Sequence, residues 1–244
     1  MDTGQLVDKL ISWIRDKVVA AGCGGIVVGM SGGLDSSVLA VLCRRAFPQD
    51  VLGVLMPCHS GQEDEEHART VAGKFSIPTK TVVLNTVFDA LLKAVAGDRV
   101  EPAVSRPAEA NLKVRLRMLT LYYFANQLKY MVAGSSNRSE LSVGYFTKYG
   151  DGGVDIMPLG NLVKGQVREL AGFLGVPQPI IDKPPSAGLW PGQTDEGELG
   201  LSYEDLDRYL VTGEVSKELR EKIESMIAAG NHKRFLPPLP DFQA

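Results

Sequence analysis

A short apolar run followed at once by a glycine-rich loop constrains this chain more than any other feature. Residues 25–30 (GIVVGM) are rich in β-branched side chains and bounded by glycine, which is typical of a buried parallel strand. The loop at 31–37 reads SGGLDSS, and residues 37–47 then place apolar side chains at helical spacing. A second strand-like run, VLGVLM, occupies residues 51–56. This strand, loop, helix and strand unit predicts an α/β fold with a parallel sheet.

The same alternation continues along most of the chain. The pattern predicts two more strands, at 80–84 and 130–133, and a set of helices at 1–22, 64–75, 87–95, 110–128, 164–174, 203–210 and 217–228. Helices between successive strands favour a doubly wound, mostly parallel sheet with helices on both faces. Glycine, proline and small polar residues indicate loops at 97–108, 134–158 and 176–194. Loops of this length in a compact domain are usually functional.

Length and composition set the broad class of the protein. The 244 residues suit a single domain spanning 1–244. Against 29 Asp and Glu there are 26 Lys and Arg, and no long basic run is present, which argues against nucleic acid as a partner. The amino-terminal helix scatters charges through its apolar pattern, so it is neither a signal peptide nor a membrane span. Three cysteines without a CxxC pair fit a reducing compartment, and we expect a cytoplasmic protein that does not associate with a membrane.

The loop at 31–37 has the chemistry of a phosphate site. Two glycines between a buried strand and a helix let backbone N–H groups converge on an anion, and the helix N-terminus adds its positive end. The loop contains neither GxxxxGK[ST] nor GxGxxG, so it is not a Walker-type or a dinucleotide-binding loop. Asp35 beside bound phosphates would need a bridging cation. The simpler alternative is a glycine-serine turn in which Asp35 caps the helix.

Following GIVVGM, the SGGLDSS loop resembles the pyrophosphatase loop of the ATP-pyrophosphatase (adenine nucleotide α-hydrolase) superfamily, whose members adenylate a substrate and release pyrophosphate. Further segments are similar to NAD synthetases: NLKVRLRM at 111–118, GSSNRSE at 134–140, GYFTKYGDGGVD at 144–155 and PLGNLVK at 158–164. The resemblance covers nearly the whole chain. It implies ATP-dependent amidation of deamido-NAD (nicotinic acid adenine dinucleotide) with ammonia, giving NAD, AMP and pyrophosphate through a NAD-adenylate.

The resemblance also implies roles for individual residues. The ATP contacts would be Gly29, Met30, Ser31, Gly32, Gly33, Leu34, Asp35, Ser36, Ser37, Ser135, Lys164 and Ser186. The deamido-NAD contacts would be Arg115, Lys148, Asp155, His232 and Lys233, and Mg²⁺ would be held by Asp35 and Glu140. Catalysis would fall to Asp151, Lys164 and Asp35. Taken singly, each of these side chains is as well explained by an ordinary surface or helix-end position; their joint order and spacing support a site.

The resemblance to NAD synthetases also predicts the nitrogen source and the oligomeric state. Glutamine-using NAD synthetases carry a large extra amidohydrolase region for which this chain has no room, so the resemblance implies free ammonia as the nitrogen source. It also implies a homodimer with the deamido-NAD site at the interface, and the apolar helix at 110–128 could pack against a partner. The basic tail near 232–238 is expected to order on ligand binding. A tRNA-modifying ATP pyrophosphatase and a non-catalytic nucleotide-binding relative are the alternatives.

Overall fold

A four-stranded sheet forms the centre of the molecule. The computed structural model describes residues 1–96, 102–190 and 192–240. Across the sheet the strands run in the order β3 (Thr79–Thr81), β2 (Val51–Leu55), β1 (Ile26–Gly29) and β4 (Met131–Ala133), and all three pairings are parallel. Because the chain passes from β1 to β2 on one side and later returns to β4 on the other, the strand order reverses beside β1. Ligands of open α/β sheets bind in the crevice at such a point, at the carboxyl ends of the strands.

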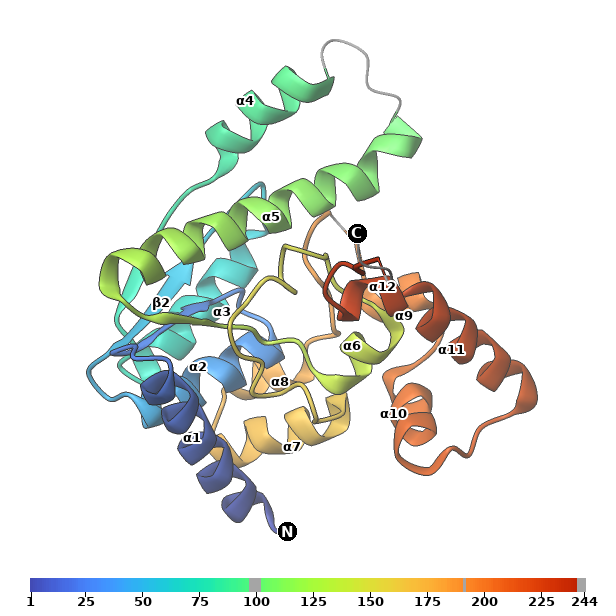
Figure 1. The fold of residues 1–244 in the computed structure, drawn as a ribbon, viewed down its shortest axis with the longest axis horizontal. Helices are drawn as coiled ribbons and strands as arrows, with labels where there is room; N and C mark the ends of the chain where they lie inside the picture. The colour runs from blue at the N-terminus through green and yellow to red at the C-terminus, as the bar shows by residue number, and fades with distance from the viewer. Residues whose placement is uncertain (97–101, 191, 241–244) are drawn as a thin grey trace.

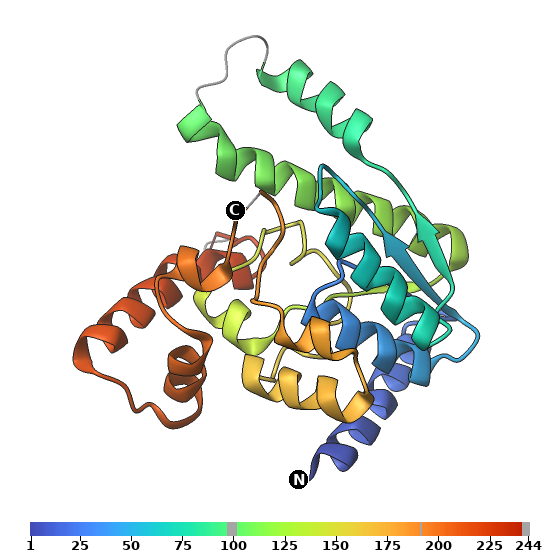
Figure 2. The ribbon, with the colours of Figure 1, turned by 180° about the vertical axis from the view of Figure 1, so that it is seen from behind.

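Helices cover both faces of the sheet, as predicted. Ile26 and Val28 pack into one core with α1 (Thr3–Ala20), α2 (Leu34–Ala46), α3 (Gln62–Lys74), α7 (Lys164–Leu174) and α8 (Gln178–Asp182). Val27 lies between them in sequence and packs into the other core, with α4 (Asn85–Ala96) and α5 (Pro102–Leu128). Successive side chains of a strand point to opposite faces, which accounts for this division. In Figures 1 and 2 the long helix α5 crosses the sheet on the side away from α1, α2 and α7.

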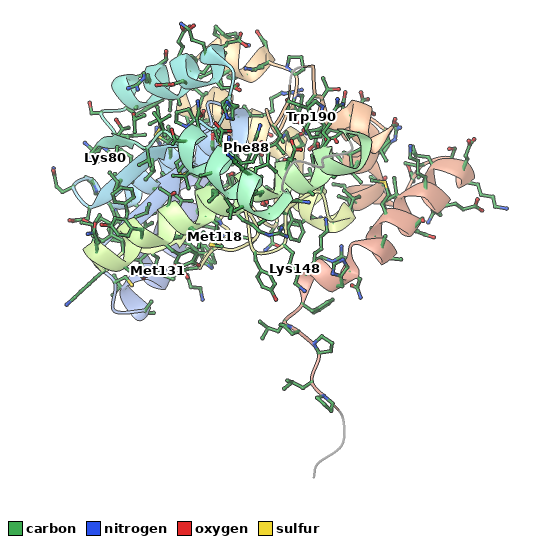
Figure 3. The ribbon with its side chains drawn as sticks, turned by 90° about the horizontal axis from the view of Figure 1, so that it is seen from above. Lys80, Phe88, Met118, Met131, Lys148 and Trp190 are labelled. Atoms are coloured by element: carbon green, nitrogen blue, oxygen red, sulfur yellow. The ribbon has the colours of Figure 1, made fainter. Side chains whose placement is uncertain are left out.

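The remaining helices gather beside the carboxyl ends of the strands. They are α6 (Arg138–Val143), α9 (Asp195–Leu199), α10 (Tyr203–Thr212), α11 (Lys217–Ala229) and α12 (Asn231–Arg234). Their own small core includes Val143, Leu206 and Ile223, and α10 also contacts α7. Figure 3 shows the segment that follows α12 extending away from the body of the molecule. In the described ranges no helix is long and apolar enough to cross a membrane.

Three segments differ from the sequence-based prediction. The stretch at 97–108 was expected to be a loop, but α5 begins at Pro102; residues 97–101 lie outside the described residues. Proline suits the first helical position because the N–H it lacks would have no partner there. The predicted loops at 134–158 and 176–194 contain the short helices α6 and α8. Helices of five or six residues are too short to show an apolar period, so composition dominated the prediction.

Candidate functional site

A cavity of about 470 Å³ opens at the carboxyl ends of the parallel strands. Gly29, Leu55 and Ala133, the last residues of β1, β2 and β4, all line it. The rest of its wall includes the glycine loop (residues 31–37), α5, the segments at 56–65 and 134–154 and the loop after α8, together with Lys164, Asp195 and Lys233. The cavity therefore lies where the strand order predicts a ligand site.

The glycine loop leaves the start of α2 open to an anion. Gly32 has a φ of +82°, and a Cβ there would lie 2.0 Å from the carbonyl oxygen of Asp64, so only glycine fits. Gly33 is the N-cap residue of α2 and makes no side-chain cap. The hydroxyls of Ser36 and Ser37 donate to the Gly33 carbonyl, at 3.1 and 2.7 Å, which braces the turn. The first N–H groups of α2 therefore have no side-chain cap and face the cavity, as an anion site requires.

Three charged side chains meet next to this loop, and we call Asp35, Glu140 and Lys164 the charged cluster. Lys164 is the first residue of α7, and its side chain is only 6% exposed. Its Nζ donates to Asp35 Oδ2 at 2.6 Å and to Glu140 Oε1 at 3.0 Å. Burial alone would lower the pKa of Lys164, but the two carboxylates outweigh burial and raise it. Burial raises the pKa of Glu140 to about 7, against the lowering effect of Lys164.

Asn137 positions both carboxylates of the charged cluster. It is fully buried, and its Nδ2 donates to Asp35 Oδ1 at 2.8 Å. As the N-cap of α6 it also forms a capping box with Glu140: the Asn137 side chain accepts from the Glu140 N–H, and Glu140 Oε2 accepts from the Asn137 N–H. Asn137 had no predicted role, although the Asn-x-x-Glu spacing of Asn137 and Glu140 is typical of a capping box.

The charged cluster fits a magnesium ion carried by a nucleotide. Asp35 and Glu140 converge on one cationic group, and carboxylate oxygens are ligands that Mg²⁺ prefers. Over the ranges that the structure describes, no group of three or more His, Cys, Asp or Glu side chains could hold a metal by itself. Mg²⁺ is commonly held by one or two carboxylates together with substrate phosphates and water. The donor set therefore suits Mg²⁺ bound with ATP rather than a dedicated protein cage.

Asp151 places a further carboxylate in the cavity, in the turn that ends the segment 144–151. Its side chain is open to the cavity but enclosed by protein on its other sides, and this enclosure raises its pKa. Backbone N–H groups oppose that shift, the clearest being Thr147, which donates to Oδ1 at 2.7 Å. The charge of Lys233 opposes it as well. Lys233 reaches the same region from α12 by donating to the Gly144 and Phe146 carbonyls, at 2.7 and 3.0 Å.

Most of the residues predicted for the site line the cavity. These are Gly29, Met30, Ser31, Gly33, Leu34, Asp35, Ser36, Ser135, Glu140, Asp151, Lys164, Ser186 and Lys233. Six predicted residues do not line it: Gly32, Ser37, Arg115, Lys148, Asp155 and His232. Gly32 and Ser37 contribute to the conformation of the glycine loop, through the positive φ of Gly32 and the hydrogen bond from Ser37 to Gly33.

The other four are predicted deamido-NAD contacts, and three of these are linked outside the cavity. Arg115 is exposed on α5 and donates to the carbonyl of Lys148, whose Nζ donates to the carbonyl of His232 at 2.7 Å. Figure 3 shows Lys148 on the side from which the carboxyl-terminal segment leaves. Asp155 accepts from the Tyr122 hydroxyl at 2.9 Å and from the Val132 N–H at 2.8 Å, so it joins α5 to β4. Lys233 is thus the single predicted deamido-NAD contact that lines the cavity.

Several cavity residues have no role in the sequence-based prediction. Arg117 donates to the Met56 carbonyl at 3.3 Å, and it lies in the NLKVRLRM segment, so it could have been found. Lys183 pairs with Asp64 at 2.7 Å, which ties the loop after α8 to the start of α3. That pair joins positions 119 residues apart, and no sequence pattern signals it. Asp195, buried at the start of α9, also faces the cavity.

Known proteins resemble this chain over nearly all of its length. A model of the family described as NAD synthase matches residues 6–237. The NH(3)-dependent NAD(+) synthetase of Carboxydothermus hydrogenoformans is 50% identical over 234 residues, which are 96% of each chain. The structure of NMN synthetase from Francisella tularensis has a TM-score of 0.94 and 35% identity, covering 99% of this chain and all of that one. The NH3-dependent NAD synthetase of Campylobacter jejuni has a TM-score of 0.81 at 27% identity, with the same coverage. By its sequence and its fold, this chain belongs to the NAD synthase family.

Proposed function

We propose that this protein is an ammonia-dependent ligase that uses ATP to convert the nicotinate carboxylate of deamido-NAD into the amide of NAD. One observation carries the proposal: the uncapped glycine loop, the charged cluster and Asp151 all face a single cavity. The names of the relatives support deamido-NAD and ammonia as substrates. They give no support to a tRNA-modifying enzyme. The acidic residues Asp35, Glu140 and Asp151 in the cavity also argue against a relative that has kept only nucleotide binding.

The first step is adenylation of the acid. The nicotinate carboxylate attacks the α-phosphorus of ATP, a new P–O bond forms, and the bond to the bridging oxygen breaks so that pyrophosphate leaves. Backbone N–H groups of the glycine loop and the ammonium of Lys164 would offset the negative charge on the phosphates. Asp35 and Glu140 would hold Mg²⁺, which neutralises phosphate oxygens when bound. In this scheme Lys164 serves the adenylation step and has no part in the delivery of ammonia.

The second step is amide formation. Ammonia attacks the acyl carbon of the adenylate, the bond to the AMP oxygen breaks, and AMP leaves with its electron pair. The nitrogen must lose a proton to become an amide. Asp151 is open to the cavity, and its raised pKa suits a general base working near neutral pH. We assign the acceptance of this proton to Asp151.

A direct assay tests the proposed function. Purified protein supplied with ATP, Mg²⁺, deamido-NAD and ammonium should form NAD, AMP and pyrophosphate in equal amounts, and glutamine in place of ammonium should give no NAD. The variant Asp35→Asn, which keeps the size of the side chain but removes a carboxylate from the charged cluster, should form no NAD. Pyrophosphate release that does not require deamido-NAD, or NAD formation from glutamine alone, would contradict the proposal.

A second candidate substrate deserves the same assay. The NMN synthetase structure superposes on this chain with a TM-score of 0.94, against 0.81 for the Campylobacter jejuni NAD synthetase. Four of the five predicted deamido-NAD contacts also lie outside the cavity. By the same chemistry, nicotinate mononucleotide would be amidated to NMN. The ratio of kcat/KM for deamido-NAD to that for the mononucleotide decides between them: a ratio above one supports NAD synthesis, and a ratio below one supports the second candidate.

The outer contacts support a homodimer that completes the dinucleotide site. Leu119 and Tyr123 on α5 are 58% and 60% exposed, and they follow Arg115 at intervals of four residues, which places all three on one helix face. Such an apolar face beside an arginine suits packing against a second copy and contact with the adenylate half of a dinucleotide. Sedimentation should give a dimer, and Leu119→Glu should give a monomer with a raised KM for deamido-NAD. A wild-type monomer would contradict this.

We also propose a cytoplasmic location. Cys23, Cys43 and Cys58 are all free thiols, as expected where thiols stay reduced. A labelled copy of the protein should fractionate with cytoplasmic markers, and recovery from an oxidising compartment would contradict the proposal.

A further inference from the structure

Tyr203 touches the charged cluster from behind the cavity wall. It is the first residue of α10, is 5% exposed and does not line the cavity. The Nζ of Lys164 lies 4.8 Å from the centre of its ring. Its hydroxyl lies 3.4 Å from Glu140 Oε1, to which it can donate. One side chain therefore contacts both the amine and a carboxylate of the cluster.

A set of buried hydrogen bonds fixes the position of Tyr203. Its hydroxyl lies 3.1 Å from Asp195 Oδ2, so Asp195 and Glu140 share its one proton as acceptors, and its backbone N–H donates to Glu196 Oε1 at 2.8 Å. Asp195 in turn accepts from the Tyr145 hydroxyl at 3.1 Å, and its N–H donates to the Pro185 carbonyl at 2.9 Å. Tyr203 is thus tied both to the segment that leads to Asp151 and to the loop after α8.

We propose that Tyr203 is a positioning residue for adenylation, holding the ammonium of Lys164 and the carboxylate of Glu140 where the phosphates of ATP arrive. The inference rests on the proposed function and adds a residue that touches no substrate. A cation is attracted to the face of an aromatic ring, and this contact strengthens when water is excluded. When Mg²⁺–ATP is bound, Asp35 and Glu140 would hold the metal and could no longer both hold Lys164. The uncharged ring does not compete for the metal or the phosphates, so it keeps Lys164 in place throughout the step.

Two substitutions separate the roles of the ring and the hydroxyl. Tyr203→Phe keeps the ring, and Tyr203→Leu removes both. Pyrophosphate release in a single turnover, with ATP, Mg²⁺ and deamido-NAD but no ammonium, measures adenylation. Ammonium added afterwards measures amide formation from the adenylate already on the enzyme. Tyr203→Leu should slow pyrophosphate release by about 150-fold, which combines about 30-fold for a desolvated cation–ring contact with about 5-fold for one hydrogen bond. Tyr203→Phe should slow it by about 5-fold, the value of one hydrogen bond.

Amide formation and the KM for ATP should stay within about two-fold of wild type in both variants, because Lys164 acts on the phosphates as charge builds on them. A purely structural role of Tyr203 would not separate the two steps. Equal slowing of both steps, or no slowing of either, overturns the inference. If thermal melting shows that Tyr203→Leu does not fold, the inference is tested with Tyr203→Phe alone, by comparing how much it slows adenylation and amide formation.

The same helix offers a matched control. The Tyr209 hydroxyl donates to Glu224 at 3.2 Å, and its ring lies 5.7 Å from the guanidinium of Arg220, away from the cavity. Tyr209→Phe and Tyr209→Leu should leave both steps unchanged, and slowing of adenylation like that of the Tyr203 variants would count against the inference. A wild-type protein that releases no pyrophosphate with deamido-NAD would refute the proposed function itself, whereas an active wild type with unaffected Tyr203 variants refutes this inference alone.

Discussion

Replacing Lys164 by methionine should reveal how strongly the charged cluster depends on one amine. In the free protein the ammonium lies 2.6 Å from Asp35 Oδ2 and 3.0 Å from Glu140 Oε1, and both carboxylates are only 15% exposed. Asp35 Oδ2 and Glu140 Oε1 both contact one amine, so they lie within about 6 Å of each other, and without the amine two like charges at that separation repel by about 3 kcal/mol at an effective dielectric constant of about 20. Removing one member of a buried ion pair typically costs about 3–5 kcal/mol. Because the cavity admits water, we expect the lower end, a loss of about 3 kcal/mol in the free energy of unfolding at pH 8.

The pH dependence of this loss has a definite sign. Lys164 lowers the pKa of Glu140, so its removal moves that pKa further above 7. A carboxyl group whose pKa is raised by folding binds its proton more tightly in the folded state, so stability is gained as pH falls through the folded pKa. The difference between Lys164→Met and wild type should therefore shrink between pH 8 and pH 5.5. Millimolar Mg²⁺ should also reduce it, because the cation would replace the missing charge.

Urea unfolding with and without Mg²⁺ measures the effect, and Lys217→Met is the matched control. Lys217 is also the first residue of a helix, but it is 88% exposed and 3.7 Å from Glu221, so its loss should change the free energy of unfolding by less than about 0.5 kcal/mol. If Lys164→Met were as stable as wild type at pH 8 and indifferent to Mg²⁺, the two carboxylates would not be coupled as the structure indicates.

Three further predictions concern other parts of the site. Asp151→Asn should lower amide formation from bound adenylate by at least about 100-fold. Because enclosure raises the pKa of Asp151, the same variant should melt at a higher temperature than wild type at pH 8, with the difference shrinking at pH 4.5; a lower melting temperature at pH 8 would contradict this. Gly32→Ala should abolish ATP binding measured by calorimetry, because the added Cβ would meet the carbonyl of Asp64. The control is Gly73→Ala in α3, where a Cβ would meet open space. This variant should bind ATP normally and gain about 0.5–1 kcal/mol in the free energy of unfolding. Lys183→Met should raise the KM for ATP about 5-fold by freeing the loop after α8, with kcat unchanged; an unchanged KM would show that its pair with Asp64 does not hold that loop over the nucleotide.

The sheet and the glycine loop beside it could be predicted from sequence because each is encoded within a short segment. The run at 25–30 shows a buried strand by its β-branched residues, and the two glycines after it mark a turn in which Gly32 takes a φ of +82° that favours glycine. Local signals of this kind need no knowledge of the rest of the fold. The start of α5 was misplaced because two prolines and a glycine between residues 97 and 107 outweighed helix periodicity, although Pro102 is well suited to a first helical position.

Side-chain contacts between segments far apart in the chain could not be predicted from the sequence. Lys183 meets Asp64, and Asn137 meets Asp35, only because β1, α3, α6 and the loop after α8 converge at one end of the sheet. The resemblance to NAD synthetases assigned Asp35, Glu140 and Lys164 to the site one at a time, without showing that they contact one another. It also grouped Arg115 and Asp155 as substrate contacts, whereas the structure gives Asp155 two hydrogen bonds that join α5 to β4.

The charge of the cavity explains why the lysine belongs between the two carboxylates. The charged cluster carries a formal charge of −1, which a divalent cation converts to +1. ATP brings about four negative charges, and Arg117, Lys183 and Lys233 also line the cavity, where they offset part of the charge of its other acidic residues, which include Asp64, Asp151 and Asp195. In the free protein, Lys164 holds Asp35 and Glu140 close together and lowers the pKa of Glu140, which favours the ionised form that can bind a metal. An arginine at position 164 would retain the charge, but its planar group could not reach both carboxylates and the phosphates from one point, so Lys164→Arg should bind Mg²⁺–ATP yet adenylate slowly.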